Sequence, residues 1–318
     1  MEDPREKWNL AVNAVTLGGE RGKKKVTVGG ETTLPFLFFE GKLPHPPVVA
    51  GEVLDRPPED WPPALSRHFE DVWHDPALWA RKYEREFGAE AILLKLDSLH
   101  PDRGDGDPAA AAAQAAAILE TVSIPLIIYG CEDHEKDNLA LPLCSQATAG
   151  AGCLIGLATD DNYKTLAAAC LADRHKLVTR GPIDINIAKQ VNILVTEMGF
   201  NPADIVIDPM TGGLGYGIEY TYSIMERIRL AALAGDRMLA MPMICDLACE
   251  IWKVKEARSP KSEFPRWGDE AIRGPAWEAT AASLLLQAGA DILVMRHPRA
   301  ISSVKAHIQR LISPGGKR

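Results

Sequence analysis

Short apolar runs that alternate with longer helical segments constrain the fold of this chain more than any other feature. Beyond residue 47, runs rich in Val, Ile and Leu are each followed by a segment with helical periodicity. Eight such runs occur, at 48–53, 91–96, 125–129, 153–157, 176–179, 204–207, 240–245 and 291–295. Their apolar residues are mostly consecutive, as strands covered on both faces require. We therefore expect eight parallel strands, each followed by a helix.

Eight βα units favour a closed (βα)8 TIM barrel. Such a barrel takes roughly 250 residues, and residues 48–318 are enough for one. A doubly wound open sheet has the same local pattern and is the alternative, but the number of repeats favours closure. Residues 1–47 remain as an N-terminal extension. Its segments 10–17 and 25–28 flank a glycine-rich turn at 18–22, which predicts a β-hairpin that caps the barrel floor.

Proline, glycine and alanine mark the expected helices. Pro108 and Pro182 stand where a first helical turn tolerates proline. Gly199 and Gly289 follow helical segments and suit the left-handed residue that ends many helices. The alanine-rich run 109–117 predicts a closely packed helix and not a linker.

Two aromatic segments lie outside this regular pattern. The segment 258–274 is predicted to be a long loop, and loops of that length are often functional. Its aromatic side chains, with those of the Phe-Leu-Phe-Phe run at 36–39, could contact another chain. For 36–39 we favour packing back on the barrel, since aromatic side chains are so often part of a core.

Charge and cysteine content exclude several classes of function. The net charge of −8 and a pI near 5.6 disfavour nucleic-acid binding. The apolar runs fall short of the roughly 20 residues of a membrane-spanning helix, and without an export signal we expect a cytoplasmic protein. The six cysteines are dispersed. Cys245 and Cys249 are close, but two thiols make a weak metal signal, so core packing is favoured and no Fe–S cluster is expected in this chain.

Polar side chains follow every expected strand, where the functional groups of a barrel lie. They are Glu52, Asp55, Lys95, Asp97, Glu132, Asp133, His134, Asp160, Asn162, Arg180, Asp184, Asn186, Asp208, Asp246, Arg296 and His297. This ring can hold a polar ligand by converging hydrogen bonds. Helix caps and ion pairs concentrate the same residue types there, and for any one residue the structural role is favoured. Lys95 and Asp97, two apart on one strand, are expected to neutralise each other.

The glycine-dense segment 208–219, Asp-Pro-Met-Thr-Gly-Gly-Leu-Gly-Tyr-Gly-Ile-Glu, is the sharpest local motif. Backbone amides ahead of a helix can cradle an anion, and a tight loop with positive φ angles explains the glycines equally well. The pattern matches neither a Walker loop nor a dinucleotide fingerprint, and the chain holds no nucleophile elbow or His-Glu-x-x-His motif. We therefore assign no catalytic residue and no metal ligand. The candidate binding residues in this loop are Asp208, Met210, Thr211, Gly212, Gly213, Gly215 and Tyr216.

Several long segments together resemble one family. They include VGGE at 28–31, LPF at 34–36, FEG at 39–41, ILLKLD at 92–97, PIDINIAKQ at 182–190, the loop 207–219, SIMERIR at 223–229 and LVMRHP at 293–298. In this order they resemble the small subunit of the corrinoid iron–sulfur protein, equivalently the delta subunit of the acetyl-CoA decarbonylase/synthase complex. The resemblance covers essentially the full chain.

The resemblance implies a barrel related to pterin-binding methyltransferases that pairs with a large subunit. That subunit would carry the [4Fe–4S] cluster and a cobalamin-type corrinoid, which this chain would cover at the subunit interface. The cobalt would accept methyl from a methyltetrahydrofolate:corrinoid methyltransferase and pass it to acetyl-CoA synthase in the reductive acetyl-CoA (Wood–Ljungdahl) pathway. Asp97, Asn186, Asp208 and the 210–216 loop would face the corrinoid. The only Asp-His run near a cobalamin-binding motif, at 133–134, has the wrong spacing.

Two other functions are compatible with the sequence. In the second hypothesis this barrel is itself a catalytic pterin methyltransferase that hydrogen-bonds the pterin ring through Asp97, Asn186 and Asp208, as relatives with this fold do. The third hypothesis is an architectural subunit that only docks the methyltransferase and the synthase. The full-length resemblance favours a non-catalytic subunit of a methyl-transfer complex.

Overall fold

Eight parallel strands form the centre of the computed structural model, which describes residues 5–19, 21 and 23–313. They are β3 (Val48–Leu54), β4 (Ala91–Lys95), β5 (Leu126–Tyr129), β6 (Leu154–Ala158), β7 (Lys176–Arg180), β8 (Ile205–Asp208), β9 (Ile244–Asp246) and β10 (Ile292–Met295). Hydrogen bonds join them in the order β8-β7-β6-β5-β4-β3-β10-β9. A parallel bridge pairs Ile207 with Met243, and Ile207 N donates to Pro242 O at 2.8 Å. The two outer strands therefore meet, which confirms a closed barrel over an open sheet.

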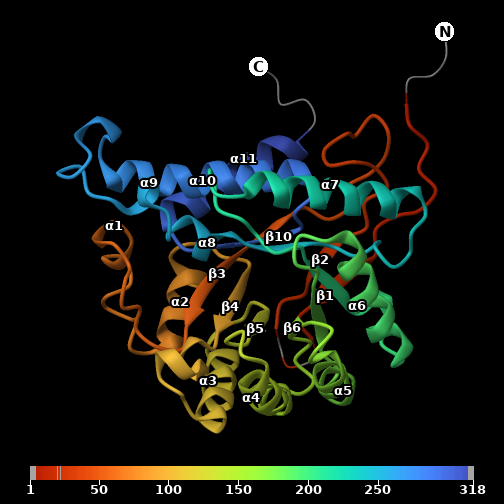
Figure 1. Ribbon diagram of the computed structural model, residues 1–318, viewed down its shortest axis with the longest axis horizontal. Helices are drawn as coiled ribbons and strands as arrows, with labels where there is room; N and C mark the ends of the chain where they lie inside the picture. The colour runs from red at the N-terminus through yellow and green to blue at the C-terminus, as the bar shows by residue number, and fades with distance from the viewer. Residues whose placement is uncertain (1–4, 20, 22, 314–318) are drawn as a thin grey trace.

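Helices surround the barrel on all sides of the strands (Figure 1). They are α1 (Pro63–Ser66), α2 (Pro76–Arg85), α3 (Pro108–Thr121), α4 (His134–Ala147), α5 (Tyr163–Asp173), α6 (Ile185–Glu197), α7 (Ile218–Ala234), α8 (Leu247–Ile251), α9 (Lys255–Arg258), α10 (Glu270–Ala288) and α11 (Pro298–Ile312). Asp107 caps α3 by accepting a hydrogen bond from Ala109 N, directly before Pro108. Gly289 ends α10 with a φ of 102°. Pro108 in a first helical turn and Gly289 as the left-handed residue after a helix are confirmed.

An N-terminal hairpin fills one end of the barrel. β1 (Ala14–Leu17) pairs antiparallel with β2 (Val26–Gly29). Val15, Leu17 and Val28 are fully buried and belong to the same apolar cluster as inward-facing barrel residues such as Ile127. The predicted hairpin is confirmed; positions 20 and 22 of its turn, like residues 314–318 at the end of the expected barrel segment, lie outside the described residues. The domain boundary at residue 47 stays a prediction, because hairpin and barrel share this cluster.

Three expected elements are placed differently in the structure. β9 begins at Ile244, because Pro242 within the expected strand has no amide hydrogen for the ladder. α6 begins after Pro182, since Asp184 accepts hydrogen bonds from the amides of Asn186 and Ile187 and so caps the helix there. The segment 258–274 is shorter than a 17-residue loop: α9 reaches Arg258, and Asp269 caps α10, which continues through Pro275.

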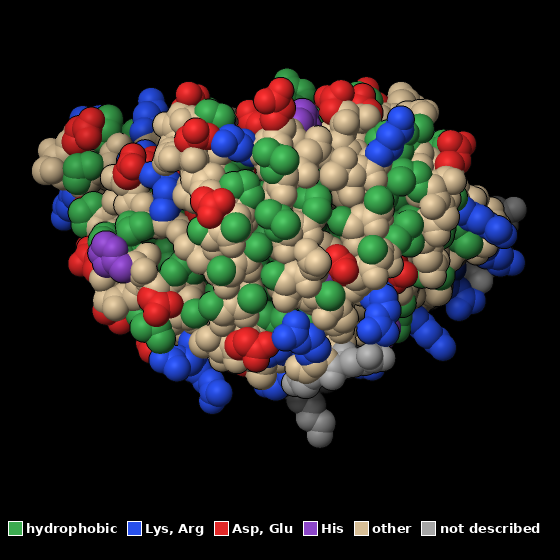
Figure 2. All heavy atoms as spheres, turned by 90° about the horizontal axis from the view of Figure 1, so that it is seen from below, with side chains coloured by type: hydrophobic (Ala, Val, Ile, Leu, Met, Phe, Trp, Pro, Cys, Tyr) green, Lys and Arg blue, Asp and Glu red, His purple; other side chains and the backbone are tan. Residues whose placement is uncertain are grey.

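The surface carries few large apolar groups in any one place. Phe36 packs against the core as expected, whereas Phe39 is 62% exposed. Over the outer helices α4 and α5, Leu139 and Leu171 are exposed, and apolar side chains alternate with charged ones on this lower face (Figure 2). Within the described ranges, no helix has the length and apolar character needed to cross a membrane.

Candidate functional site

A cavity of about 720 Å³ opens at the C-terminal ends of the barrel strands. Residues from several strand ends and loops line it, including Lys95, Asp97, Met210, Cys249, Trp252 and Arg296. The short helices α1, α8 and α9 lie around this end, which is on the left in Figure 1, and the hairpin lies toward the other end. We call this cavity and its rim the barrel mouth. It is where the sequence predicts a functional site.

Three cross-strand contacts pair the charges at the barrel mouth. Lys95 Nζ of β4 lies 2.6 Å from Asp246 Oδ2 of β9. Arg180 of β7 contacts Asp208 Oδ2 of β8 at 3.1 Å. The charges of each pair come from different strands, so their separation depends on barrel closure.

The third pair joins the last strand to the first strand of the barrel. Arg296, directly after β10, contacts Glu52 of β3 at 2.5 and 2.9 Å. The Arg296 guanidinium also lies over the Trp61 ring, 4.8 Å from the ring centroid. Arg296 is therefore held by a bidentate ion pair on one side and an aromatic face on another.

These pairings set the ionisation of the buried carboxylates. Burial by itself raises the pKa of Asp246, but the Lys95 ammonium outweighs this and holds that pKa below its usual range. For Asp208 the balance is opposite, since complete burial raises its pKa despite the neighbouring Arg180. Five Lys and Arg residues and five Asp and Glu residues line the cavity, so the mouth is close to neutral in its own charges.

The expected contact between Lys95 and Asp97 is wrong. β4 ends at Lys95, and Asp97 begins a short 3-10 helix (Asp97–Leu99), so the two side chains do not share a strand face. Arg56 Nε instead lies 2.6 Å from Asp97 Oδ2, and Arg103 hydrogen-bonds the other carboxylate oxygen. Burial raises the pKa of Asp97, but these two arginines bring it below its usual range. Asp97 does line the cavity.

The glycine-dense loop satisfies its own backbone groups. Gly213 O accepts hydrogen bonds from Tyr216 N and Ile218 N, and Gly212 N donates to Thr221 Oγ1 at 2.8 Å. A Cβ on Gly212 would meet the carbonyl carbon of Gly217 at 2.6 Å. Gly215 and Gly217 have φ values of +83° and +106°. Close backbone approach and positive φ therefore explain these glycines, which supports the tight-loop interpretation.

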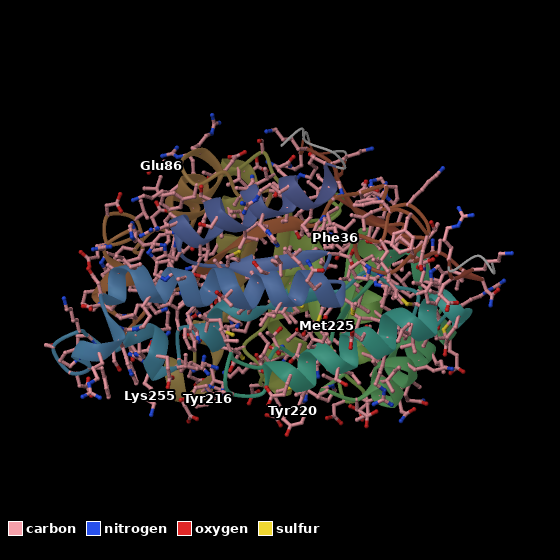
Figure 3. The ribbon with its side chains drawn as sticks, turned by 90° about the horizontal axis from the view of Figure 1, so that it is seen from above. Phe36, Glu86, Tyr216, Tyr220, Met225 and Lys255 are labelled. Carbon is pink, nitrogen blue, oxygen red and sulfur yellow. The ribbon has the colours of Figure 1, made fainter. Side chains whose placement is uncertain are left out.

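The candidate loop residues divide between two hollows. Met210 lines the main cavity and is 41% exposed. Gly213 and Tyr216 line a second hollow of about 370 Å³ with Lys255 and its neighbours. Figure 3 shows Tyr216 and Lys255 close together at one edge of the molecule, with Phe36 far from them. The exposed Tyr216 hydroxyl donates to the Glu256 carboxylate at 3.1 Å.

Asn186 does not line either hollow. It is exposed on the first turn of α6, and its backbone amide donates to the Asp184 side chain at 2.7 Å. Asp208 is buried beneath the loop, where it also accepts from Met210 N at 2.8 Å. The residues expected to bind one ligand together are therefore spread over the rim, the loop and the interior.

Several residues at the mouth carry no signal in the sequence. Arg56 and Trp61 lie on irregular loops and Arg103 ends a short 3-10 helix (Pro101–Arg103), and none of them belongs to a motif. Glu278 lies in the middle of α10, far along the chain from any strand end, and yet it is completely buried behind the cavity wall. The only sign of Glu278 in the sequence is that a charged residue stands on an otherwise apolar face of the expected helix.

Comparisons with known proteins agree on a family and on a fold. The family model for the CO dehydrogenase/acetyl-CoA synthase delta subunit matches residues 14–303. An acetyl-CoA decarbonylase/synthase complex subunit delta from Methanothermobacter thermautotrophicus is 38% identical over 284 residues, covering 89% of this chain and 72% of the relative. The subunit of the same name from Methanocaldococcus jannaschii is 34% identical over 310 residues, covering 96% and 75%.

Solved structures with a similar fold are dihydropteroate synthases. The Vibrio fischeri ES114 enzyme has a TM-score of 0.57 at 13% identity, covering 95% of this chain and all of that chain (100%). The Coxiella burnetii enzyme in complex with pteroic acid has a TM-score of 0.55 at 14% identity, covering 94% and 100%. At such identities the likeness shows a shared barrel and nothing about ligands.

Proposed function

The chain belongs to the CO dehydrogenase/acetyl-CoA synthase delta subunit family, and from this premise we propose that it is the small subunit of a corrinoid iron–sulfur methyl carrier. In this role its barrel mouth covers a cobalamin-type corrinoid held by a large subunit, which also carries the [4Fe–4S] cluster. A methyltetrahydrofolate:corrinoid methyltransferase and acetyl-CoA synthase are the enzymes on either side of the transfer in the Wood–Ljungdahl pathway.

One observation carries this proposal: the charged groups of the barrel mouth are paired with one another around a wide cavity. A catalytic site needs groups free to bind substrate or move a proton. Here Lys95, Arg180 and Arg296 are each bound to a carboxylate from another strand. Such a surface is rigid, close to neutral and ready to lie against a ligand that another chain holds.

The residues present fit a corrinoid that is covered and not anchored by this chain. Among the described residues, no group of His, Cys, Asp and Glu side chains is arranged to hold a metal ion. Burial raises the pKa of Cys249, so this cavity residue stays a neutral thiol. The half-buried Trp61 offers apolar contact, and exposed Lys253 and Glu132 at the rim can hydrogen-bond the amide side chains of a corrinoid.

The division of chemistry follows from this fit. A bound corrinoid would supply a cobalt centre that accepts and releases the methyl group. The residues of this chain would exclude water from one face of the site, which matters because solvent and oxidants quench a strong reductant. Arg296 and Lys95 would keep their positions during transfer because each is already paired.

The proposal is tested by producing the chain together with its large subunit. We expect the two to co-purify with a corrinoid absorption spectrum, and the Co(I) state to oxidise several-fold more slowly than in the large subunit alone. Lys253→Glu at the mouth should weaken co-purification, because it reverses a charge at the covered rim. Lys25→Glu, the same change on the exposed hairpin, is the matched control and should have no effect. Equal Co(I) oxidation rates with and without the chain would refute the proposal.

The geometry gives less support to a pterin methyltransferase. That function needs Asp97, Asn186 and Asp208 to converge on one ring, whereas Asn186 is outside the cavity and both carboxylates are bound by arginines. Calorimetric titration of the chain with methyltetrahydrofolate separates the two functions. Saturable micromolar binding together with methyl transfer to free cobalamin would favour the enzyme.

A further inference from the structure

Glu278 is a buried carboxylate that the proposed function does not use. It lies in the middle of α10 and is 0% exposed. Its Oε1 accepts a hydrogen bond from Arg296 N at 2.6 Å, and its Oε2 accepts from His297 N at 3.1 Å and from Trp252 Nε1 at 3.0 Å. All of these donors are neutral N–H groups, and the described residues place no cation within ion-pair distance of this carboxylate.

Such a carboxylate is costly to bury. Its ionised form is penalised by desolvation, and without a directly bound cation that penalty is offset by hydrogen bonds and by the more distant charge of Arg296. Burial raises the pKa of Glu278 to about 7, although the surrounding donors all favour the ionised form. An apolar residue of similar volume would pack this helix against the barrel without that penalty. The carboxylate therefore needs an explanation other than packing.

What Glu278 holds is one wall of the barrel mouth. Trp252 and Arg296 both line the cavity; Trp252 is the C-cap residue directly after α8, and Arg296 lies in the loop after β10. Glu278 binds the Trp252 indole with one oxygen and the Arg296 amide with the other. One carboxylate thereby sets the distance between two cavity residues that belong to separate elements.

Further contacts extend the same wall. The Trp252 ring stacks on His297, with ring centroids 5.8 Å apart and an interplanar angle of 14°. Tyr83 Oη donates to Arg296 O at 2.9 Å. From this fixed backbone the Arg296 side chain reaches Glu52 and Trp61. If the Glu278 carboxylate were absent, three N–H groups in a buried region would lose their acceptor at once.

We propose that Glu278 is a positioning residue that holds Trp252 and Arg296 in the arrangement that faces the corrinoid. Its two acceptor oxygens carry this role, and its bulk does not. The inference rests on the proposed function for the identity of the ligand, but the positioning itself is a property of this chain.

Glu278→Gln tests the positioning in the isolated full chain. Gln has nearly the same shape, and its oxygen can still accept from Arg296 N, but its NH2 group would face the Trp252 N–H, donor against donor. In a chain labelled with 15N-tryptophan, the seven indole resonances report each tryptophan separately, and Trp252→Phe identifies its own. We expect the Trp252 resonance to shift strongly in E278Q while that of Trp8, near the N-terminus, stays in place.

The complex with the large subunit tests the connection to function. We expect E278Q to keep the wild-type far-UV circular dichroism spectrum and to co-purify with the large subunit and its corrinoid. It should nevertheless lose at least half of the protection of Co(I) against oxidation. In E278Q/W252F no indole N–H opposes the Gln amide. W252F should therefore reduce the protection of Co(I) less when it is added to E278Q than when it is added to the wild type. If E278Q does not fold, recovery of a wild-type far-UV circular dichroism spectrum in E278Q/W252F carries the test, because that variant no longer sets the Gln amide against the indole N–H; a double variant that also fails to fold would contradict the inference.

The possible results separate this inference from the proposed function. An unmoved Trp252 resonance in folded E278Q, fully additive effects in the double variant, or wild-type protection of Co(I) in the E278Q complex would each overturn the role of Glu278. Absence of protection by the wild-type chain would instead refute the proposed function. In that case a shifted Trp252 resonance would still establish that Glu278 positions the wall.

Discussion

The two ends of the barrel close the same ring of strands in different ways. At the floor, the hairpin places Val15, Leu17 and Val28 inside the ring, and all three are fully buried. At the mouth, a cavity of about 720 Å³ stays open between the strand ends. The floor is filled with apolar side chains, whereas the mouth is left hollow, as the proposed cover over a corrinoid requires.

Charged groups show the same contrast. Near the floor Arg229 of α7 contacts Glu31 at 3.3 Å and Asp291 at 2.8 Å, and all three are at most 4% exposed. This triad ties the segment after the hairpin to α7 and to the start of β10. At the mouth the pairs border the cavity, where they keep a partly solvated surface neutral. Buried charges at the floor therefore join separate elements of the fold, whereas those at the mouth form the wall of the cavity.

Arg229→Met should produce the largest effect, because it leaves the Asp291 carboxylate buried without its cation and removes the hydrogen bond to the Glu31 carboxyl group. We expect the free energy of unfolding to fall by about 3–5 kcal/mol, measured by urea denaturation. Lys82→Met is the control, since its partner Asp71 is 62% exposed and such pairs contribute roughly 1 kcal/mol or less. If Arg229→Met lowered the free energy of unfolding no more than Lys82→Met, the expected difference between buried and exposed ion pairs would be contradicted.

Leu17→Ala tests the apolar plug and ranks second. Removing this fully buried side chain should destabilise the chain by roughly 2–5 kcal/mol, through lost burial and the cavity left behind. Leu139→Ala, where the side chain is 61% exposed, should change stability by less than about 0.5 kcal/mol. Thermal and urea unfolding of both variants measure the difference. Similar values for the two would mean that the hairpin does not seal the floor.

Lys95→Met tests the mouth and should have a smaller effect. It deprives Asp246 of its cation next to the open cavity, and we expect a loss of about 1–3 kcal/mol at pH 7. The folded-state pKa of Asp246 is lowered from 3.8, so the stability that the pair contributes is present above that value and is lost as the pH falls through the folded pKa. Urea unfolding at pH 7 and in acid should therefore show the difference from wild type shrinking in acid. A difference that is independent of pH would contradict this assignment.

Glu31→Gln should change the free energy of unfolding least at neutral pH. It tests whether Glu31 is protonated in the folded chain. Burial and the nearby Asp291 raise the pKa of Glu31 from 4.5 to about 9. A raised carboxyl pKa means that the folded state holds a proton that the unfolded state releases, so stability declines as the pH rises from about 4.5 to 9. In the variant this decline should be weaker, as unfolding measured across pH 5–9 would show. An unchanged slope would argue that Glu31 is ionised in the folded chain.

The strands were predictable because their signal is local. Consecutive apolar residues in β3 to β8 and β10 mark positions covered on both faces, and seven of the eight expected strands lie within one residue of the observed bounds. β9 is the exception, because its expected first half contains Pro242. Helix caps at Asp107 and Gly289 were also predictable, since a cap depends on residues only a few positions apart.

The sequence by itself determined that the charged residues at the strand ends gather at the barrel mouth, because parallel strands bring their C-terminal ends to one side. Arg56, Arg103 and Trp61 do not directly follow a strand, and only the tertiary structure places them there. Only the tertiary structure decided how these residues are paired. Lys95 meets Asp246, 151 positions away, and Glu52 meets Arg296, 244 positions away, while Asp97 turns from Lys95 toward two arginines. The physical reason is that strand endings depend on the local backbone, whereas the contacts between charges depend on how the whole ring closes.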